Sequence, residues 1–281
     1  MKNSGTIQGK LFNIETKVNT DDLIIATVTI EVGDNRIPVE FIANAKKTNG
    51  EASKTYPAFQ TFIADAKTIV GFGDEADFVE AKMVSLKENL FSPDGNGIVS
   101  NTNIAANFFS RIPATEPNAE ITIGGVVMSA VETIKNDIPT GELELVIEHT
   151  NVFNNKPYTD MIKLNVSNPS HIAFVKTNYT PGMEVALTVE PHVTEETIET
   201  VIADGGFGGA IIETKPVKTR KLEVIKGGAA TTPLIADEVR AEGRAGREGR
   251  VVKAKDKAKK KASGTATAPK SAGASVPSFT L

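Results

Sequence analysis

The stretch that decides the fold runs from residue 76 to residue 111 and reads ADFVEAKMVSLKENLFSPDGNGIVSNTNIAANFFSR. Its centre carries an Asp-Gly and an Asn-Gly pair at 94–97, and these residue types tolerate the positive φ that tight hairpin turns need. Residues 78–84 alternate between two faces, as they do in a half-buried strand. The segment from Ile98 to Phe109 is also compatible with β-structure. We therefore predict two long strands joined by a hairpin turn.

Composition narrows the class of protein. The chain has 281 residues, 40% of them hydrophobic, with no Cys and no Trp. This length suits two domains of ordinary size, or one domain with appendages, and the lack of Cys excludes disulfides, thiolate catalysis and Cys-ligated zinc. No apolar run approaches the roughly 18 residues that span a bilayer, and residues 1–10 lack the apolar core of a signal peptide. We therefore expect a soluble, cytoplasmic protein.

Charge is divided unevenly along the chain. Residues 239–281 hold 11 Lys and Arg against 3 Asp and Glu, whereas residues 1–238 hold 20 basic and 32 acidic residues. The body is therefore acidic and the tail is strongly basic. Because clustered basic residues attract polyanions, the tail is the part whose charge predicts contact with nucleic acid.

The first half of the chain is expected to contain three strands, one helix and two strands, in that order. The first three strands are expected at 5–16, 23–32 and 37–45, where β-branched residues are frequent. Residues 56–69 have helical spacing, with Phe59 and Phe62 on one face. The long hairpin follows. This is the order of elements in an OB fold, a five-stranded Greek-key barrel.

The same order is repeated in the second half. Strands are expected at 120–133, 141–151 and 157–166, a helix at 169–179, and strands at 183–193 and 211–224. The first strands of the two halves can be aligned, with Ile7 matching Ile123 and Gly9 matching Gly125. Such an internal repeat indicates a duplicated unit. We therefore predict a mainly β fold of two tandem OB-like small barrels, each with one helix, with domain boundaries at 1–112 and 118–228.

Residues 229–281 are predicted to form a basic flexible tail that is disordered or partly helical. Ala, Glu, Arg and Lys favour a helix there, but three glycines between 243 and 249 each weaken it by about 1 kcal/mol relative to Ala. The final stretch, rich in Ala, Ser, Thr and Pro, is expected to be disordered. It ends in PSFTL, so Phe279 and Leu281 are candidates for binding a partner protein.

The element order, the long hairpin, the phrase LFSPDGNGIVSNTNIAANFF and the tethered C-terminus resemble single-stranded DNA-binding proteins, in their phage-type or tandem-OB forms. Gly9-Lys10-Leu11, the helix at 56–69 and Asp94-Gly95 stand where that family has a first-strand G-x-L, a helix after strand three and a hairpin turn. Two departures are clear. Bacterial members end in an acidic tail with a terminal Pro-Phe, and many members stack bases on Trp. The resemblance implies a non-catalytic protein of DNA replication or recombination, encoded by a phage and acting in the host cytoplasm.

Candidate binding residues follow from the chemistry of single strands, which are held by basic grooves and aromatic platforms. In an OB barrel the ligand face comprises strands two and three with the flanking loops. Phe41 fits either the core or a stacked base, whereas Phe91 and Phe153 lie beside turns, where stacking is the more natural role. The nucleic-acid-binding candidates are Arg36, Phe41, Lys46, Lys47, Lys87, Phe91, Phe153, Lys156, Tyr158, Lys218 and Arg220.

An enzyme is not expected, because catalytic residues are not gathered in any known motif. His149, His171 and His192 lack the spacing of metal ligands, and the glycines at 205–209 lack the Lys-Ser/Thr of a phosphate loop. We expect no cofactor and no metal. Two alternatives to DNA binding stay open: a structural or assembly protein of a virion, and a protein-interaction subunit of a replication complex.

Overall fold

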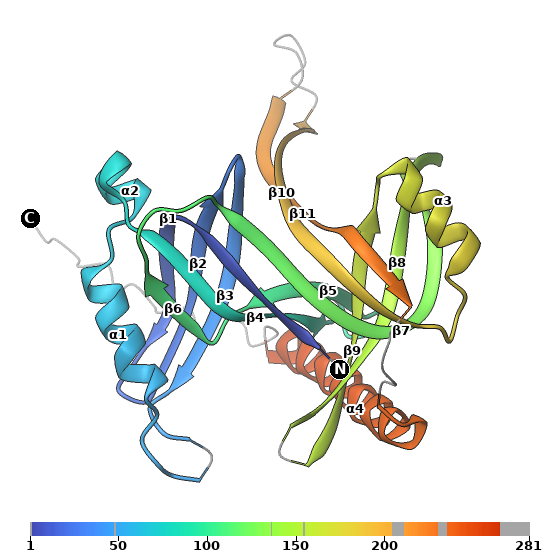
Figure 1. Ribbon diagram of the computed structural model, residues 1–281, viewed down its shortest axis with the longest axis horizontal. Helices are drawn as coiled ribbons and strands as arrows, with labels where there is room; N and C mark the ends of the chain where they lie inside the picture. Colours follow the sequence, from blue (N-terminus) through green and yellow to red (C-terminus); the bar gives the residue numbers. More distant parts are fainter. Residues whose placement is uncertain are drawn as a thin grey trace, which may run out of the picture.

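Strand pairing in the computed structural model joins eleven strands into one sheet, which curls into two barrels (Figure 1). The structure describes residues 2–47, 49–135, 137–153, 155–203, 211–229 and 235–264. Side chains are described in these ranges except at 195–203, 211–218 and 262–264.

The first barrel has the strand order β1-β2-β3-β5-β4 and closes where β4 returns to pair with β1. Strands β3 and β5 run parallel, and the others are antiparallel. This is the Greek-key order of an OB fold. Its elements are β1 (Asn3–Asn19), β2 (Leu23–Val32), β3 (Asn35–Asn44), α1 (Thr55–Asp65), α2 (Ile69–Phe72), η1 (Gly73–Glu75), β4 (Phe78–Phe91), β5 (Val99–Ala105) and β6 (Phe108–Arg111).

The second barrel repeats this order as β7-β8-β9-β11-β10, and β10 closes it on β7. Helix α3 again lies between the third and fourth strands in sequence. The mainly β prediction of two tandem OB-like barrels is therefore confirmed. The elements are β7 (Asn118–Lys135), β8 (Ile138–Phe153), β9 (Lys156–Val166), α3 (Pro169–Asn178), β10 (Glu184–Ala203), β11 (Ile211–Ala229) and α4 (Asp237–Gly264).

Alternation along the strands builds the core of each barrel. In β2 every second residue from Ile24 to Val32 is buried, and the residues between them face outward. Helix α1 covers one end of the first barrel, and its Phe59 and Phe62 are buried as their spacing predicted. Phe41 is only 1% exposed, and the centre of its ring lies 3.7 Å from that of Phe59, with the two rings tilted by 31°. The core alternative therefore holds for Phe41, and a nucleic acid base does not reach it.

The long hairpin differs from the prediction in its second arm, which is split into β5 and β6. Strand β5 pairs with residues 85–91 of β4, and β6 pairs with residues 79–82. Between them, Met83 bulges out of β4 with a φ of 53°, and the Ala106 N–H donates to the Glu40 carbonyl. The strand breaks because β5 must leave β4 here and meet β3 to close the barrel.

The two barrels are joined by main-chain hydrogen bonding as well as by side chains. Residues 3–8 of β1 pair antiparallel with residues 118–123 of β7. Helix α4 lies below the barrels in Figure 1, against β9, β8 and β4. The expectation of a partly helical tail is confirmed, but the sequence did not predict that this helix packs on the body. The domain boundaries stay a prediction.

Candidate nucleic-acid interface

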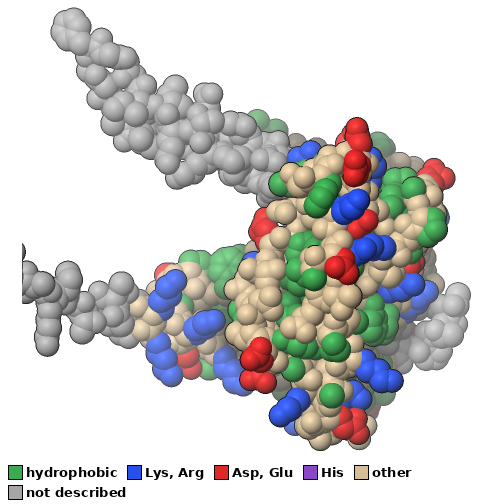
Figure 2. Space-filling view, turned by 90° about the vertical axis from the view of Figure 1, so that its left-hand side faces the viewer, with side chains coloured by type: hydrophobic (Ala, Val, Ile, Leu, Met, Phe, Trp, Pro, Cys, Tyr) green, Lys and Arg blue, Asp and Glu red, His purple; other side chains and the backbone are tan. Residues whose placement is uncertain are grey.

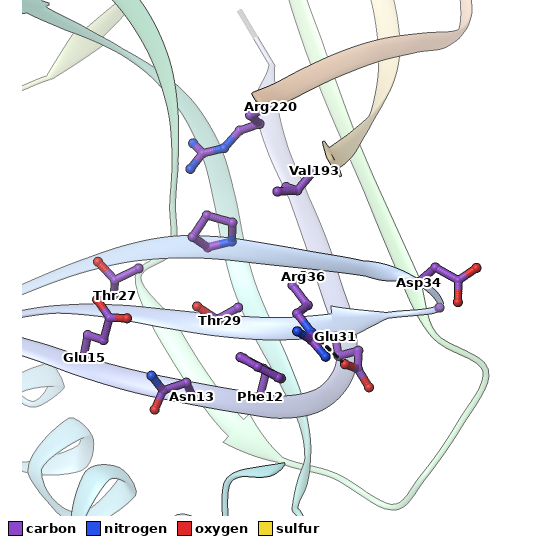
Figure 3. Close-up of a pocket in the computed structure, with 12 residues that line it drawn as sticks. Phe12, Asn13, Glu15, Thr27, Thr29, Glu31, Asp34, Arg36, Val193 and Arg220 are labelled. Carbon is purple, nitrogen blue, oxygen red and sulfur yellow. Dashed lines mark hydrogen bonds and ion pairs between the residues drawn. The ribbon is translucent and has the colours of Figure 1, made fainter. Parts of the chain in front are cut away.

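A cleft of 620 Å³ lies on the outward face of the first three strands of barrel one (Figure 3). Phe12, Thr29 and Arg36 line it from β1, β2 and β3, because outward residues alternate with core residues along each strand. Arg220 and Val193, from the β10–β11 hairpin of the other barrel, line its opposite side. This surface is the OB ligand face, covered along one edge by the second barrel.

A second cleft, of 530 Å³, adjoins the first at Arg220, which lines both. Barrel two lines it with residues 219–222 of β11 and with side chains of β8 and β9, the strands of its equivalent ligand face, and strand β5 of barrel one forms the other wall. Three asparagines line it, namely Asn101, Asn103 and Asn165. We call the two clefts together the inter-barrel groove. The groove therefore joins the ligand faces of both barrels.

Charge in the inter-barrel groove is nearly balanced. The Arg36 Nε lies 3.2 Å from Glu31 Oε2, and its guanidinium carbon lies 4.0 Å from the centre of the Phe12 ring. Lys163 lies 3.5 Å from a carboxylate oxygen of Glu144. Arg220 instead donates to the Thr102 carbonyl at 3.5 Å, and burial lowers its pKa, although Glu40 opposes that shift. Arg220 is therefore the cation in the groove without a carboxylate within ion-pair distance among the described residues.

A third cleft, of 580 Å³, brings together four of the predicted binding residues. Lys87 from barrel one and Phe153, Lys156 and Tyr158 from barrel two line it, and we call it the aromatic cleft. Phe153 is 72% exposed, so its ring is free to stack on a base. Burial, followed by the charge of Asp160, raises the pKa of Tyr158 to about 12, so Tyr158 stays a neutral donor.

The other predicted residues are dispersed. Lys46 and Lys47 lie on the exposed loop after β3, where Lys47 pairs with Glu51 at 3.0 Å. Phe91 ends β4 beside the hairpin turn and is 41% exposed. Lys218 lies on β11 opposite Glu195, and its side chain is outside the described residues. Phe279 and Leu281 also lie outside the described residues.

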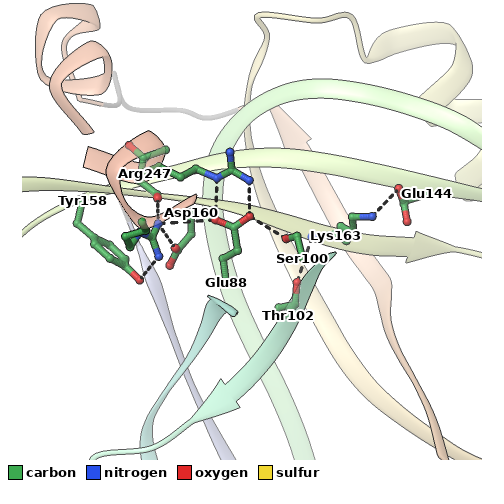
Figure 4. Close-up of polar contacts among 10 residues, drawn as sticks. Glu88, Ser100, Thr102, Glu144, Tyr158, Asp160, Lys163 and Arg247 are labelled. Carbon is green, nitrogen blue, oxygen red and sulfur yellow. Dashed lines mark hydrogen bonds and ion pairs between the residues drawn. The ribbon is translucent and has the colours of Figure 1, made fainter. Parts of the chain in front are cut away.

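Sequence reasoning missed a row of arginines on α4 that binds buried carboxylates, and Figure 4 shows one of them, Arg247, at Glu88. Glu148 of β8 is fully buried, with Arg240 3.2 Å and Arg244 3.0 Å away. The Arg240 Nε contact lacks hydrogen-bond geometry and is an ion pair only. Arg247 grips Glu88 of β4 with two hydrogen bonds of 2.6 and 2.7 Å. We call Arg240, Arg244, Arg247 and Arg250 the arginine ladder.

Arg250 ends the ladder at barrel two. It donates to Asp160 of β9 at 2.9 Å and to the Thr159 carbonyl, and its guanidinium carbon lies 4.4 Å from the centre of the Tyr158 ring. Its Nη2 also lies 3.6 Å from Glu88 Oε2. The ladder therefore connects α4 to both barrels at once.

The environment sets the ionisation of these buried acids. Burial opposes the charge on Glu88, but hydrogen bonds from Arg247 and Ser100 outweigh it, so the pKa of Glu88 is lowered. At Asp160 burial dominates and raises the pKa, despite the opposing contact with Arg250. Burial also lowers the pKa of His149, whose Nδ1–H donates to the Gly124 carbonyl at 2.7 Å. A carboxylate as buried as that of Glu88 requires a positively charged partner, and Arg247 of α4 supplies it.

One feature of the sequence could have indicated that α4 has a bound face. The ladder arginines are spaced by four, three and three residues, which places them on one side of a helix. Gly243 lies on the same side, and a Cβ there would stand 2.2 Å from Thr159 Oγ1. The glycine that weakens the helix is therefore what lets α4 approach β9.

Other surfaces of the described chain carry less distinctive chemistry. On the side that bears α1 and α2, acidic and basic side chains are interspersed (Figure 2). No group of three His, Cys, Asp or Glu among the described residues is placed to hold a metal ion. Within the same ranges, no helix has the length and apolar character needed to cross a membrane.

Comparison with known proteins gives one family and several solved structures. The model of the family described as YorF matches residues 2–235. The wild-type single-stranded DNA-binding protein from Thermus aquaticus is 10% identical, with a TM-score of 0.46 over 85% of this chain and 98% of that one. The Plasmodium falciparum protein solved with single-stranded DNA is 13% identical, with a TM-score of 0.28 over 41% and 96% of the two chains. No curated protein matches the chain.

Proposed function

The chain belongs to the YorF family, and we propose that it binds single-stranded DNA in the inter-barrel groove without catalysing a reaction. The observation that carries this proposal is the position of Arg220, which lines both the cleft on the ligand face of barrel one and the cleft beside β8 and β9 of barrel two. A single strand is long and flexible, so it gains contacts from every barrel face that lies along its path.

The chemistry of the groove suits a flexible polymer. Asn and Thr side chains donate and accept hydrogen bonds, and so meet either phosphates or base edges. Phe12 offers a ring face beside Arg36, and the aromatic cleft adds Phe153 and Tyr158. Alternating polar and aromatic contacts of this kind bind single strands without a strong sequence preference.

The finer role follows from the resemblance to single-stranded DNA-binding proteins. The protein would protect exposed strands during replication or recombination, in the cytoplasm of a host cell if a phage encodes it. A C-terminal segment ending in Phe279 and Leu281 would recruit other proteins of the same process.

Titration of labelled dT oligonucleotides, followed by fluorescence anisotropy at low and high salt, tests the proposal. Replacing Arg220 by Ala is expected to weaken binding by about 10- to 100-fold, because a charged hydrogen bond contributes about 1.5–3 kcal/mol. Arg111→Ala serves as the matched control, since Arg111 pairs with Asp77 away from the groove. Absence of dT binding by the unaltered protein at low salt would refute the function.

A second candidate is a protein-interaction subunit or an assembly protein, and the balanced charge of the groove favours it. Arg36, Lys163 and Lys221 each face a carboxylate there, as groups at protein–protein contacts often do. This candidate predicts a partner that co-purifies after nuclease treatment. Loss of the partner on nuclease treatment, together with tight dT binding, would favour the first function.

A further inference from the structure

We propose that α4 has two roles along its length: the arginine ladder fastens the barrels, and the lysine-rich half, residues 251–261, binds the phosphate backbone of a single strand. This inference rests on the proposed function. Judged by net charge alone, all basic residues of α4 would be equivalent. The inference instead assigns the arginines to holding the structure together and the lysines to binding nucleic acid.

The arginine ladder is already committed to the protein itself. Arg240 and Arg244 face Glu148, Arg247 holds Glu88, and Arg250 reaches Asp160. These carboxylates are buried or nearly so, so releasing an arginine to a phosphate would leave a charge without its partner in the interior. The ladder is therefore unavailable to a nucleic acid while α4 is docked.

The lysine-rich half has the opposite character. Residues 251–261 contain six lysines against one aspartate. Lys253, Lys257 and Lys259 are exposed, and no carboxylate of the described residues lies within ion-pair distance of any of them. Unpaired ammonium groups on a fixed helix attract phosphates without first breaking an internal contact.

The neighbour of this half is the β4–β5 hairpin, which supplies an aromatic group. Lys259 Cγ lies 2.6 Å from the position that a Cβ on Gly95 would take, so the helix reaches the hairpin turn. Phe91, at the base of that turn, is 41% exposed. Cations beside an exposed ring are the combination by which single strands are held.

The two halves of α4 also connect the proposed surfaces. Arg250 lies over the ring of Tyr158, which lines the aromatic cleft. The lysine-rich half begins at the next residue, its first lysine, Lys253, follows about one turn after Arg250, and the half continues to the hairpin. A DNA single strand that leaves the aromatic cleft along α4 would thus meet a row of lysines. These lysines supply the net positive charge that the inter-barrel groove lacks.

The test compares two triple variants in dT binding as a function of salt. Lys253→Gln, Lys257→Gln and Lys259→Gln are combined in one protein. The control combines Lys54→Gln, Lys67→Gln and Lys176→Gln, exposed lysines at α1, α2 and α3 with the same total charge change. Each phosphate contact adds about 0.7 to the slope of log K against log salt for single strands. The α4 variant is therefore expected to lose roughly 2 from that slope, and the control to lose none.

Four results are informative. An α4 variant that keeps the slope of the unaltered protein, with binding that still depends on Arg220, overturns the inference and leaves the proposed function standing. Equal losses in both variants also overturn it, because binding would then follow net charge alone. If the unaltered protein fails to bind dT at low salt, the function and the inference are both wrong. Unfolding in urea checks that each variant is folded, and a stable α4 variant with a lowered slope supports the division of roles.

Discussion

Replacing Gly243 by Ala tests whether α4 is docked as the structure describes. A Cβ at this position would lie 2.2 Å from Thr159 Oγ1 and 3.2 Å from Thr159 Cβ, whereas ordinary contacts begin at 3.4 Å. Thr159 has little freedom to turn away, because it is fully buried and its hydroxyl bonds that of Thr150 at 2.8 Å. The helix must therefore retreat by about 1 Å, which is enough to break the short ion pairs of the arginine ladder.

The magnitude follows from two opposing effects. Ala is a better helix former than Gly, so the substitution alone would stabilise α4 by about 0.8–1.0 kcal/mol. Loss of a buried ion pair costs about 3–5 kcal/mol, and the ladder contains several that share one helix. We expect a net destabilisation of about 2–4 kcal/mol, with α4 released from the body.

Gly246→Ala and Gly249→Ala are matched controls on the same helix, since nothing lies within 4 Å of a Cβ at either position. They should stabilise the protein slightly. Unfolding in urea measures the free energies, and trypsin reports α4 release, because the helix is rich in Lys and Arg. Equal stability and equal trypsin resistance in Gly243→Ala and Gly246→Ala would contradict the docked arrangement.

Two further predictions concern the aromatic and acidic residues. Phe41→Ala should destabilise the fold by about 3–5 kcal/mol in urea unfolding. Phe153→Ala should leave stability unchanged and weaken dT binding by about 1–3 kcal/mol. The opposite pattern would mean that Phe153 is the core residue and Phe41 the binding residue. Because the folded-state pKa of Glu88 is lowered, its carboxylate stabilises the fold above pH 4.5, the ordinary value, and this contribution is lost as pH falls through the folded pKa. The stability gap between the unaltered protein and Glu88→Gln, measured by urea midpoints at pH 7 and pH 3, should therefore narrow at pH 3, and a constant gap would contradict this assignment.

Local patterns were sufficient to predict the strands and their order. Alternation in β2 and the Asp-Gly turn at Asp94 act within a few residues, and the second barrel repeats the same signals. The split between β5 and β6 was not predictable in this way. It depends on Ala106 meeting Glu40, a contact between residues far apart in sequence that exists only in the closed barrel.

The candidate site shows the same limit. Alternation placed Phe41 on one face of β3, but it did not say which face is the core. From the sequence, the arginines of α4 belong to a basic flexible tail that contacts nucleic acid, because their partners Glu88, Glu148 and Asp160 lie about 90 or more residues earlier in the chain. An acidic residue within a predicted strand indicates a buried ion pair only when its basic partner is known.

The pairing of β1 with β7 has a symmetry that bears on how the molecule is built. Aligning Ile7 with Ile123 also aligns Asn3 with Ala119, and the ladder pairs Asn3 with Ile123 and Ile7 with Ala119. Exchanging the two halves therefore maps the pairing onto itself, about a two-fold axis that passes between Gly5 and Ile121. This is the contact that two copies of a single barrel would make as a homodimer. The chain thus has the form of a covalently linked dimer, and a barrel cut out alone would expose the edge of its first strand and seek a second copy.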